Sequence, residues 1–150
     1  MGMFGMFGKK KDKAEGDDYG SDMVGMMKMM ATMPTMMRKP MMKGRITQLL
    51  SLPEERRQES IRDMIGAFHS PEVNDSARDK LVATRVEIIG EMSEDDRRKI
   101  MTSRAAGLKV APQLEEVDQQ VTMRVLPQIS ESARAAFVAT REELMKNMGG

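Results

Sequence analysis

The sequence lacks cysteine and tryptophan and contains one histidine, one tyrosine and four phenylalanines. Without cysteine the chain has no disulfide framework, no thiolate metal site and no cysteine nucleophile. A single histidine excludes a histidine-rich ligand set. Long apolar runs are also missing. The nearest candidate, residues 23–42, is interrupted by charged residues and prolines, so the sequence predicts no membrane-spanning helix.

Charge and aromatic content argue against nucleic acid as a partner. Residues 1–50 carry nine basic and five acidic side chains, whereas residues 51–150 carry fifteen and eighteen. A nucleic-acid-binding domain usually has its basic excess on the folded part, together with aromatic rings for base stacking. The apolar residues 1–8 precede a lysine run, which is the reverse of a secretory signal peptide. We therefore expect a cytoplasmic protein that binds no nucleic acid.

Composition divides the chain into three zones. Residues 1–22 are rich in glycine and lysine, then acidic, and show no period, so we expect them to be disordered when free. Residues 23–42 contain ten methionines, and we interpret them as a binding arm. Residues 43–150 have a helical pattern and predict the folded domain.

Residues 43–150 predict six or seven short helices and no strand. The spacing of Ile61, Met64, Ile65 and Phe68 is typical of the buried face of a helix. Alternating β-branched runs and glycine-containing hairpin turns are missing. Helix starts are predicted at Ser51, Ser70, Ser93 and Ser130, with further helices at 43–50 and through 114–125.

A weak internal repeat recurs about every 40 residues. Arginine followed by isoleucine or valine occurs at 45, 85 and 124, and a serine-started, charge-rich helix opening follows each pair. The tetrapeptide Val-Ala-Thr-Arg occurs twice, at Val82–Arg85 and Val138–Arg141. Two helices per unit of this length fall in the HEAT range. The predicted fold is all-α with antiparallel helix pairs, either a HEAT-like repeat or a plain helical bundle.

The run Leu52–Arg57, with the sequence LPEERR, resembles the helix-opening motif of the cytoplasmic helical domain of MgtE-type magnesium transporters. This resemblance covers one helix start. It implies a capped amphipathic helix within a helical array. No functional residue is carried over from that family.

The polar residues do not predict an enzyme. The acids gather at helix starts, where the helix dipole favours negative charge, as at Glu54, Glu55, Asp95, Asp96, Glu115 and Glu116. His69 follows a helical pattern and is typical of a helix end or loop. The glycines of residues 1–8 have neither the preceding strand nor the following helix of a phosphate-binding loop. We therefore expect no catalytic residue, cofactor, metal ion or small-molecule substrate.

The methionines of residues 23–42 suggest a function. Methionine forms flexible, polarizable surfaces that adapt to apolar partners, and this composition resembles the Met-rich substrate-binding helices of signal-recognition-particle proteins. We predict a non-enzymatic accessory or scaffold subunit whose arm docks on a hydrophobic surface of a protein partner in a larger complex. The helical domain would meet a second partner. The predicted partner-binding residues are Met23, Met26, Met27, Met29, Met30, Met33, Met36 and Met37.

Other interpretations of the same segment stay open. In one, the arm makes peripheral membrane contact: aromatic side chains insert and basic side chains meet anionic headgroups. The residues that would do so are Phe4, Phe7, Lys9, Lys10, Lys11, Lys28, Arg38 and Lys39. In another, thioethers at Met-x-x-Met spacing bind Cu(I) and the protein is a copper carrier, although the absence of cysteine weakens this idea. A Met-biased linker without function is the remaining interpretation.

Overall fold

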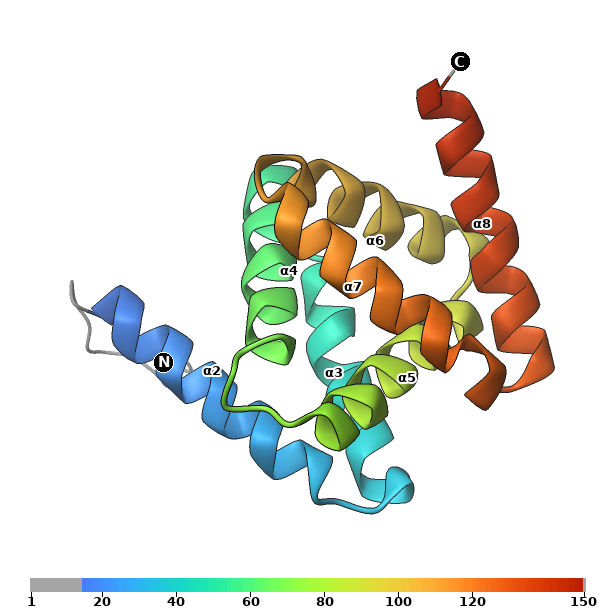
Figure 1. The fold of residues 1–150 in the computed structure, drawn as a ribbon. Helices are drawn as coiled ribbons and strands as arrows, with labels where there is room; N and C mark the ends of the chain where they lie inside the picture. Colours follow the sequence, from blue (N-terminus) through green and yellow to red (C-terminus); the bar gives the residue numbers. More distant parts are fainter. Residues whose placement is uncertain (1–14, 150) are drawn as a thin grey trace.

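The computed structural model describes residues 15–149, and the side chains of residues 22–147 within them. In this part of the chain it forms seven α-helices, two single-turn 3-10 helices and no strand, which confirms the predicted all-helical class (Figure 1). The elements are α2 (Glu15–Ala31), α3 (Thr35–Leu49), α4 (Glu54–Phe68), α5 (Asp75–Glu91), α6 (Glu94–Gly107), η1 (Leu108–Val110), α7 (Pro112–Val125), η2 (Leu126–Gln128) and α8 (Glu131–Gly149).

Side-chain caps define several helix starts. The Ser93 hydroxyl accepts the backbone N–H of Asp96 at 3.2 Å, and Ser130 accepts that of Ala133 at 3.3 Å, so both of these predicted caps are confirmed. The starts predicted at Ser51 and Ser70 are wrong. The helices begin later, after Pro53 and Asn74. Helix α4 begins after Pro53 because proline has a preset φ and needs no N–H at the first turn. Helix α5 begins after Asn74 because the Asn74 side chain caps it.

One arginine contact recurs at the helix starts. In five helices the fourth residue after the N-cap is an arginine whose guanidinium donates to the carbonyl of the residue before the cap. The distances are 2.6 Å for Arg38–Met33, 2.6 Å for Arg57–Leu52, 2.7 Å for Arg97–Met92 and 3.4 Å for Arg134–Ile129, and Arg78–Val73 is the fifth pair. Each arginine therefore ties the incoming chain to the first turn of its helix.

Three of these arginines also join helices two places apart. The Nε of Arg38 donates to Thr84 at 3.0 Å, that of Arg57 to Ser103 at 2.8 Å and that of Arg97 to Thr140 at 2.8 Å. Each hydroxyl is on the tenth residue after the N-cap of α5, α6 or α8. Each helix therefore packs on the second helix after it, and α5 lies near the centre of the molecule (Figure 1).

A row of residues recurs at the same places along four helices. We call the residues 4, 8, 11 and 15 places after the N-cap the forward row. Its apolar members are buried in four successive helices. The rows are Arg38, Met42, Arg45 and Leu49 in α3; Arg57, Ile61, Met64 and Phe68 in α4; Arg78, Val82, Arg85 and Ile89 in α5; and Arg97, Met101 and Arg104 in α6 with its C-cap, Leu108.

The methionine-rich segment is part of this packing. Met23, Met27 and Met30 recur at helical spacing on α2 and lie in the core, with Met42 of α3. Helix α2 packs on α4 and α5. The predicted boundary at residue 43 falls inside α3. Residues 23–42, interpreted as an arm, therefore lie within the helical fold, because their methionines form an amphipathic face.

Candidate functional site

Helix α7 departs from the pattern shared by its neighbours. Its fourth residue after the N-cap is Glu115, where five other helices have arginine. Its seventh is Asp118, at the place where α5, α6 and α8 have Leu81, Ile100 and Phe137. The tenth residue after its N-cap is Val121, whereas α5, α6 and α8 have a hydroxyl side chain at this place. A carboxylate therefore occupies a position that is apolar core in three other helices.

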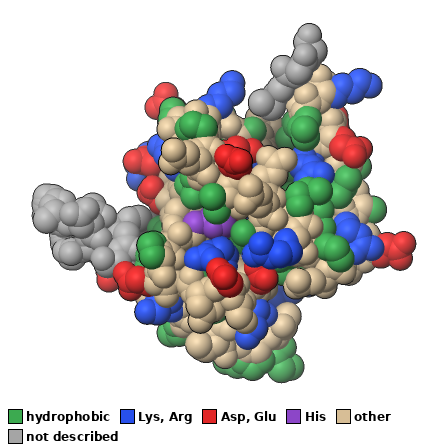
Figure 2. Space-filling model, viewed as in Figure 1, with side chains coloured by type: hydrophobic (Ala, Val, Ile, Leu, Met, Phe, Trp, Pro, Cys, Tyr) green, Lys and Arg blue, Asp and Glu red, His purple; other side chains and the backbone are tan. Residues whose placement is uncertain are grey.

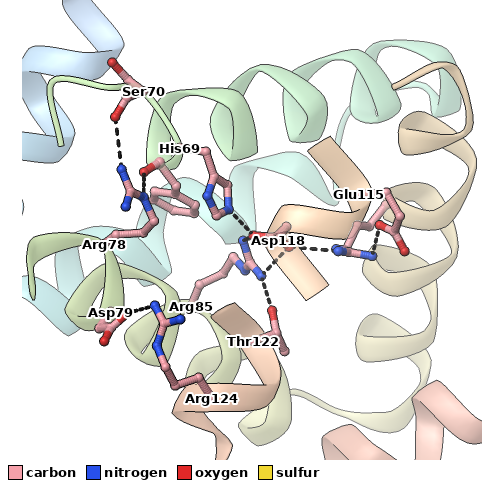
Figure 3. Close-up of polar contacts among 11 residues, drawn as sticks. His69, Ser70, Arg78, Asp79, Arg85, Glu115, Asp118, Thr122 and Arg124 are labelled. Atoms are coloured by element: carbon pink, nitrogen blue, oxygen red, sulfur yellow. Dashed lines mark hydrogen bonds and ion pairs between the residues drawn. The ribbon is translucent and has the colours of Figure 1, made fainter. Parts of the chain in front are cut away.

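Asp118 is fully buried and is met by two arginines and a histidine from three helices or their ends (Figure 3). Arg85 contacts both carboxylate oxygens, at 2.9 and 3.1 Å, and also donates to Thr122 at 3.2 Å. Arg104 donates to Asp118 at 2.8 Å. The Nε2 of His69 donates to its Oδ1 at 2.8 Å, since an ionised carboxylate can only accept.

The cations keep Asp118 ionised. Burial by itself raises the pKa of this carboxyl, but the charge of Arg85, the hydrogen bond from His69 and the charge of Arg104 outweigh it and hold the pKa well below its usual range. Arg85 also lies over the Phe68 ring, 5.4 Å from its centroid. Because every bond to Asp118 comes from a cation or a donor, the carboxylate is a structural anchor and is not free to accept a substrate proton.

A pocket of about 470 Å³ opens beside this cluster, between α5 and α7, and Figure 2 shows the histidine among basic and acidic side chains there. Its charges are paired. Arg124 donates to Asp79 at 2.6 Å, and Arg78 to Asp75 at 2.7 Å. Its lining residues are His69, Asp75, Arg78, Asp79, Val117, Val121 and Arg124. The pocket therefore offers polar walls without an uncompensated charge.

The predicted partner-binding methionines divide between the core and the surface. Met23, Met27 and Met30 are buried, and Met26 and Met33 are partly buried. Met29, Met36 and Met37 are 50%, 81% and 56% exposed. The structure therefore brings only part of the predicted set to the surface. Of the Met-x-x-Met pairs considered for Cu(I), Met27–Met30 lies wholly in the core and Met30–Met33 lies half in it.

The basic residues considered for membrane contact have partners within the fold. Arg38 is buried and bonds Met33 and Thr84. Lys39 donates to Glu91 at 2.9 Å, and Lys28 lies 3.8 Å from Glu72. The other candidates, Phe4, Phe7, Lys9, Lys10 and Lys11, lie outside the described residues.

Sequence reasoning missed Asp118 and placed His69 at a helix end without a role. His69 is the C-cap of α4, and its ring reaches α7. A signal was present, because Asp118 falls four residues after Leu114 and three before Val121, in the middle of an apolar helical series. Nothing in the sequence indicated which cations, from α5 and α6, would meet it.

A comparison with models of protein families, with curated proteins and with solved structures found no match to this chain. Within residues 15–149, no helix has both the length and the apolar composition needed to cross a bilayer. Across the same described part, no three acidic or histidine side chains converge as a metal site.

Proposed function

We propose that this protein is a non-enzymatic accessory or scaffold subunit that docks on a hydrophobic surface of a protein partner through exposed methionines of α2 and α3. One observation carries the proposal: Met29, Met36, Met37 and Met41 stay between 42% and 81% exposed beside methionines that are fully buried. We call these four residues the methionine surface. Three of them belong to the set predicted from the sequence, and Met41 is added.

The geometry of α3 supports a continuous surface. Met37 and Met41 are one helical turn apart, and so are Met36 and the exposed Pro40. Apolar side chains gather at the lower end of the molecule, near the α2–α3 connection (Figure 2). Burying a methionine side chain contributes about 1.5–3 kcal/mol, so a partner that covers most of this surface gains enough to bind.

The pairing of nearby charges favours a protein over a lipid surface. Membrane attachment needs basic side chains that can reach headgroups, at about 1 kcal/mol for each. Arg38 is buried and Lys39 is paired with Glu91, so two basic side chains of α3 already have partners. A protein contact depends on apolar burial and needs neither residue.

The remaining helices would serve as the scaffold. The recurrence of one arginine contact in successive helices supports a repeat-like array over an irregular bundle, although its unit is a single helix rather than the helix pair of a HEAT repeat. The proposal includes a cytoplasmic location and a second partner for the array.

The test compares two triple variants of the full chain, Met36, Met37 and Met41 changed to serine or to leucine. A photo-crosslinker at position 29 identifies the bound protein, whose affinity is then measured with purified components. We expect the serine variant to lose at least about tenfold in affinity, and the leucine variant to bind like the wild type, because apolar burial drives the contact. Val110→Ser, an exposed change elsewhere, is the control.

Three outcomes would count against this proposal. If the serine variant binds the purified partner as well as the wild type does, the methionine surface is not the docking site. If full-length protein floats with vesicles of phosphatidylcholine and phosphatidylserine, and salt reverses this, the surface meets lipid. If the leucine variant loses binding while the wild type binds Cu(I), the thioethers act as metal ligands.

A further inference from the structure

The forward row of α8 repeats the residue pattern of the inner helices, but among the described residues its C-terminal end, at Met145, is left open. Counted from Ser130, its members are Arg134, Val138, Arg141 and Met145. The last member of the row is Leu49, Phe68, Ile89 or Leu108 in the other helices, and each of these is at most 8% exposed, whereas Met145 is 56% exposed. The last place of the row, which is core in four helices, is therefore open on the fifth, where Val138 is partly buried against the core.

The polar members of this row also lack their usual partners. In α3, α4 and α6 the Nε of the first arginine donates to a hydroxyl two helices further on. Among the described residues, Arg134 uses only its Nη1, toward Leu126 and Ile129. The Nε of Arg141 is buried without a hydrogen-bond partner, and its Nη1 contacts only the Met123 sulfur, at 2.8 Å.

An internal comparison indicates what would cover the row. Val-Ala-Thr-Arg occurs at residues 82–85 of α5 and at 138–141 of α8, at the same distance from the N-cap. On α5 the arginine of this tetrapeptide meets α7, with Arg85 on the Asp118 carboxylate and the Thr122 hydroxyl, and its threonine accepts from Arg38 of α3. On α8, Thr140 is buried against Arg97 of α6 and Val138 is partly buried against the core, but among the described residues no carboxylate meets Arg141. Figure 1 shows the C-terminal half of α8 extending past α6.

We infer that the α8 forward row is a docking site for an amphipathic helix of a protein partner that carries an Asp or Glu in its apolar face. The apolar side chains of that helix would cover Val138 and Met145, and its carboxylate would pair with Arg141 as Asp118 pairs with Arg85. The row itself contains two arginines and no acid, which makes a carboxylate the complementary charge. This site is separate from the methionine surface and gives the scaffold its second partner.

The helix that covers the equivalent row provides a probe. A fluorescein-labelled peptide of residues 111–128, crosslinked between positions 116 and 120 to hold it helical, presents the face that α7 turns to α5. Glu116 and Gln120 are both exposed, so the crosslink leaves that face clear. Its binding to the full chain is followed by fluorescence anisotropy. We expect saturable binding with a Kd below about 1 mM.

Matched variants test whether the peptide binds at the α8 forward row. Arg141→Gln in the protein and Asp118→Asn in the peptide should each weaken binding about tenfold, and the two changes together no further, because each removes one side of the same ion pair. Met145→Ser tests the apolar contact at an exposed position where misfolding is not at issue. Arg56→Gln, an exposed arginine on α4, should leave binding unchanged. Thermal melts of every variant verify folding.

Several results would overturn the inference. Absence of saturable binding removes the docking site. Binding that Arg141→Gln leaves intact places the peptide elsewhere, for instance on α5 in exchange for α7. Sedimentation that shows a wild-type dimer and an Arg141→Gln monomer would make a second copy of this chain the occupant. None of these results affects the test of the methionine surface as a docking site, because its variants lie on α2 and α3.

Discussion

At the scale of single residues, the informative ones are those that break the shared helix pattern. Asp118 occupies a place that is leucine, isoleucine or phenylalanine in three other helices. A buried charge is costly unless it is paired, and the paired charges here come from Arg85, Arg104 and the hydrogen bond of His69. The cluster joins the end of α4 to α5, α6 and α7, so it fixes how α7 sits on the array.

The first prediction concerns Asp118→Asn. The change leaves Arg85 buried without its counter-charge, and we expect it to lower the free energy of unfolding by about 3–5 kcal/mol. Replacing both members, with Arg85→Met and Asp118→Leu, should restore most of this loss, because an apolar pair of similar volume removes both charges. Urea unfolding followed by circular dichroism measures the three variants against the wild type.

The pH dependence of stability checks the same cluster. The folded-state pKa of Asp118 is depressed, so its stabilisation is fully present above the unfolded-state value of about 3.9 and is lost as pH falls toward the folded-state value. The wild type should lose stability below about pH 5 more steeply than the double variant does. Parallel pH profiles for the two proteins would show that Asp118 is not the group responsible.

Sequence alone predicted some of these residues and missed others for a physical reason. The serines at 93 and 130 act through neighbours a few residues away, and their caps were predictable. The partners of Asp118 come from residues 14 to 49 places away in the chain, so no local pattern shows them. The methionine composition predicts a binding surface that includes Met23, Met27 and Met30, whereas their helical spacing fits the buried face on which the structure places them.

At the scale of elements, five of the described helices have an arginine near their start, and successive N-caps from α3 to α8 are about twenty residues apart. The Arg-Ile and Arg-Val pairs at 45, 85 and 124 lie on α3, α5 and α7, and each of these helices packs on the next of the three. The Val-Ala-Thr-Arg copies do not follow this spacing, because they lie 56 residues apart, on α5 and α8. The recurrence from one helix to the next could not be predicted, because proline, asparagine and serine all serve as N-caps. No single residue type therefore marks the helix starts.

The second prediction concerns the crossing of α5 and α8. A Cβ on Gly90 would lie 2.3 Å from the backbone oxygen of Ala133, so Gly90→Ala must push the two helices apart. We expect a loss of about 1–3 kcal/mol in urea unfolding. Gly66→Ala on α4 is the control, since a Cβ there meets nothing within 4 Å. It should stabilise by about 0.5–1 kcal/mol through helix propensity. Equal effects at both positions would mean that the helices do not cross this closely.

At the scale of the whole molecule, the N-terminal helices close one end of the array. Helix α2 covers α4 and α5, and α3 packs on α5 through the buried contact between Arg38 and Thr84. Removing both helices would expose the apolar surface that Met27, Met30 and Met42 now cover. The methionine-rich segment would then contribute to folding as well as to binding.

The last prediction separates these two roles by truncation. A chain of residues 15–150 should melt cooperatively, like the full chain, because it keeps every described helix. A chain of residues 43–150 loses α2 and the first half of α3, and its Tm should fall by at least about 10 °C or its transition should broaden. The triple serine variant of Met36, Met37 and Met41 should keep the wild-type Tm, since those side chains are exposed. If residues 43–150 instead melt like the full chain, then residues 23–42 are an independent arm, as their composition suggested, and the helix packing drawn for α2 and α3 contributes nothing to stability.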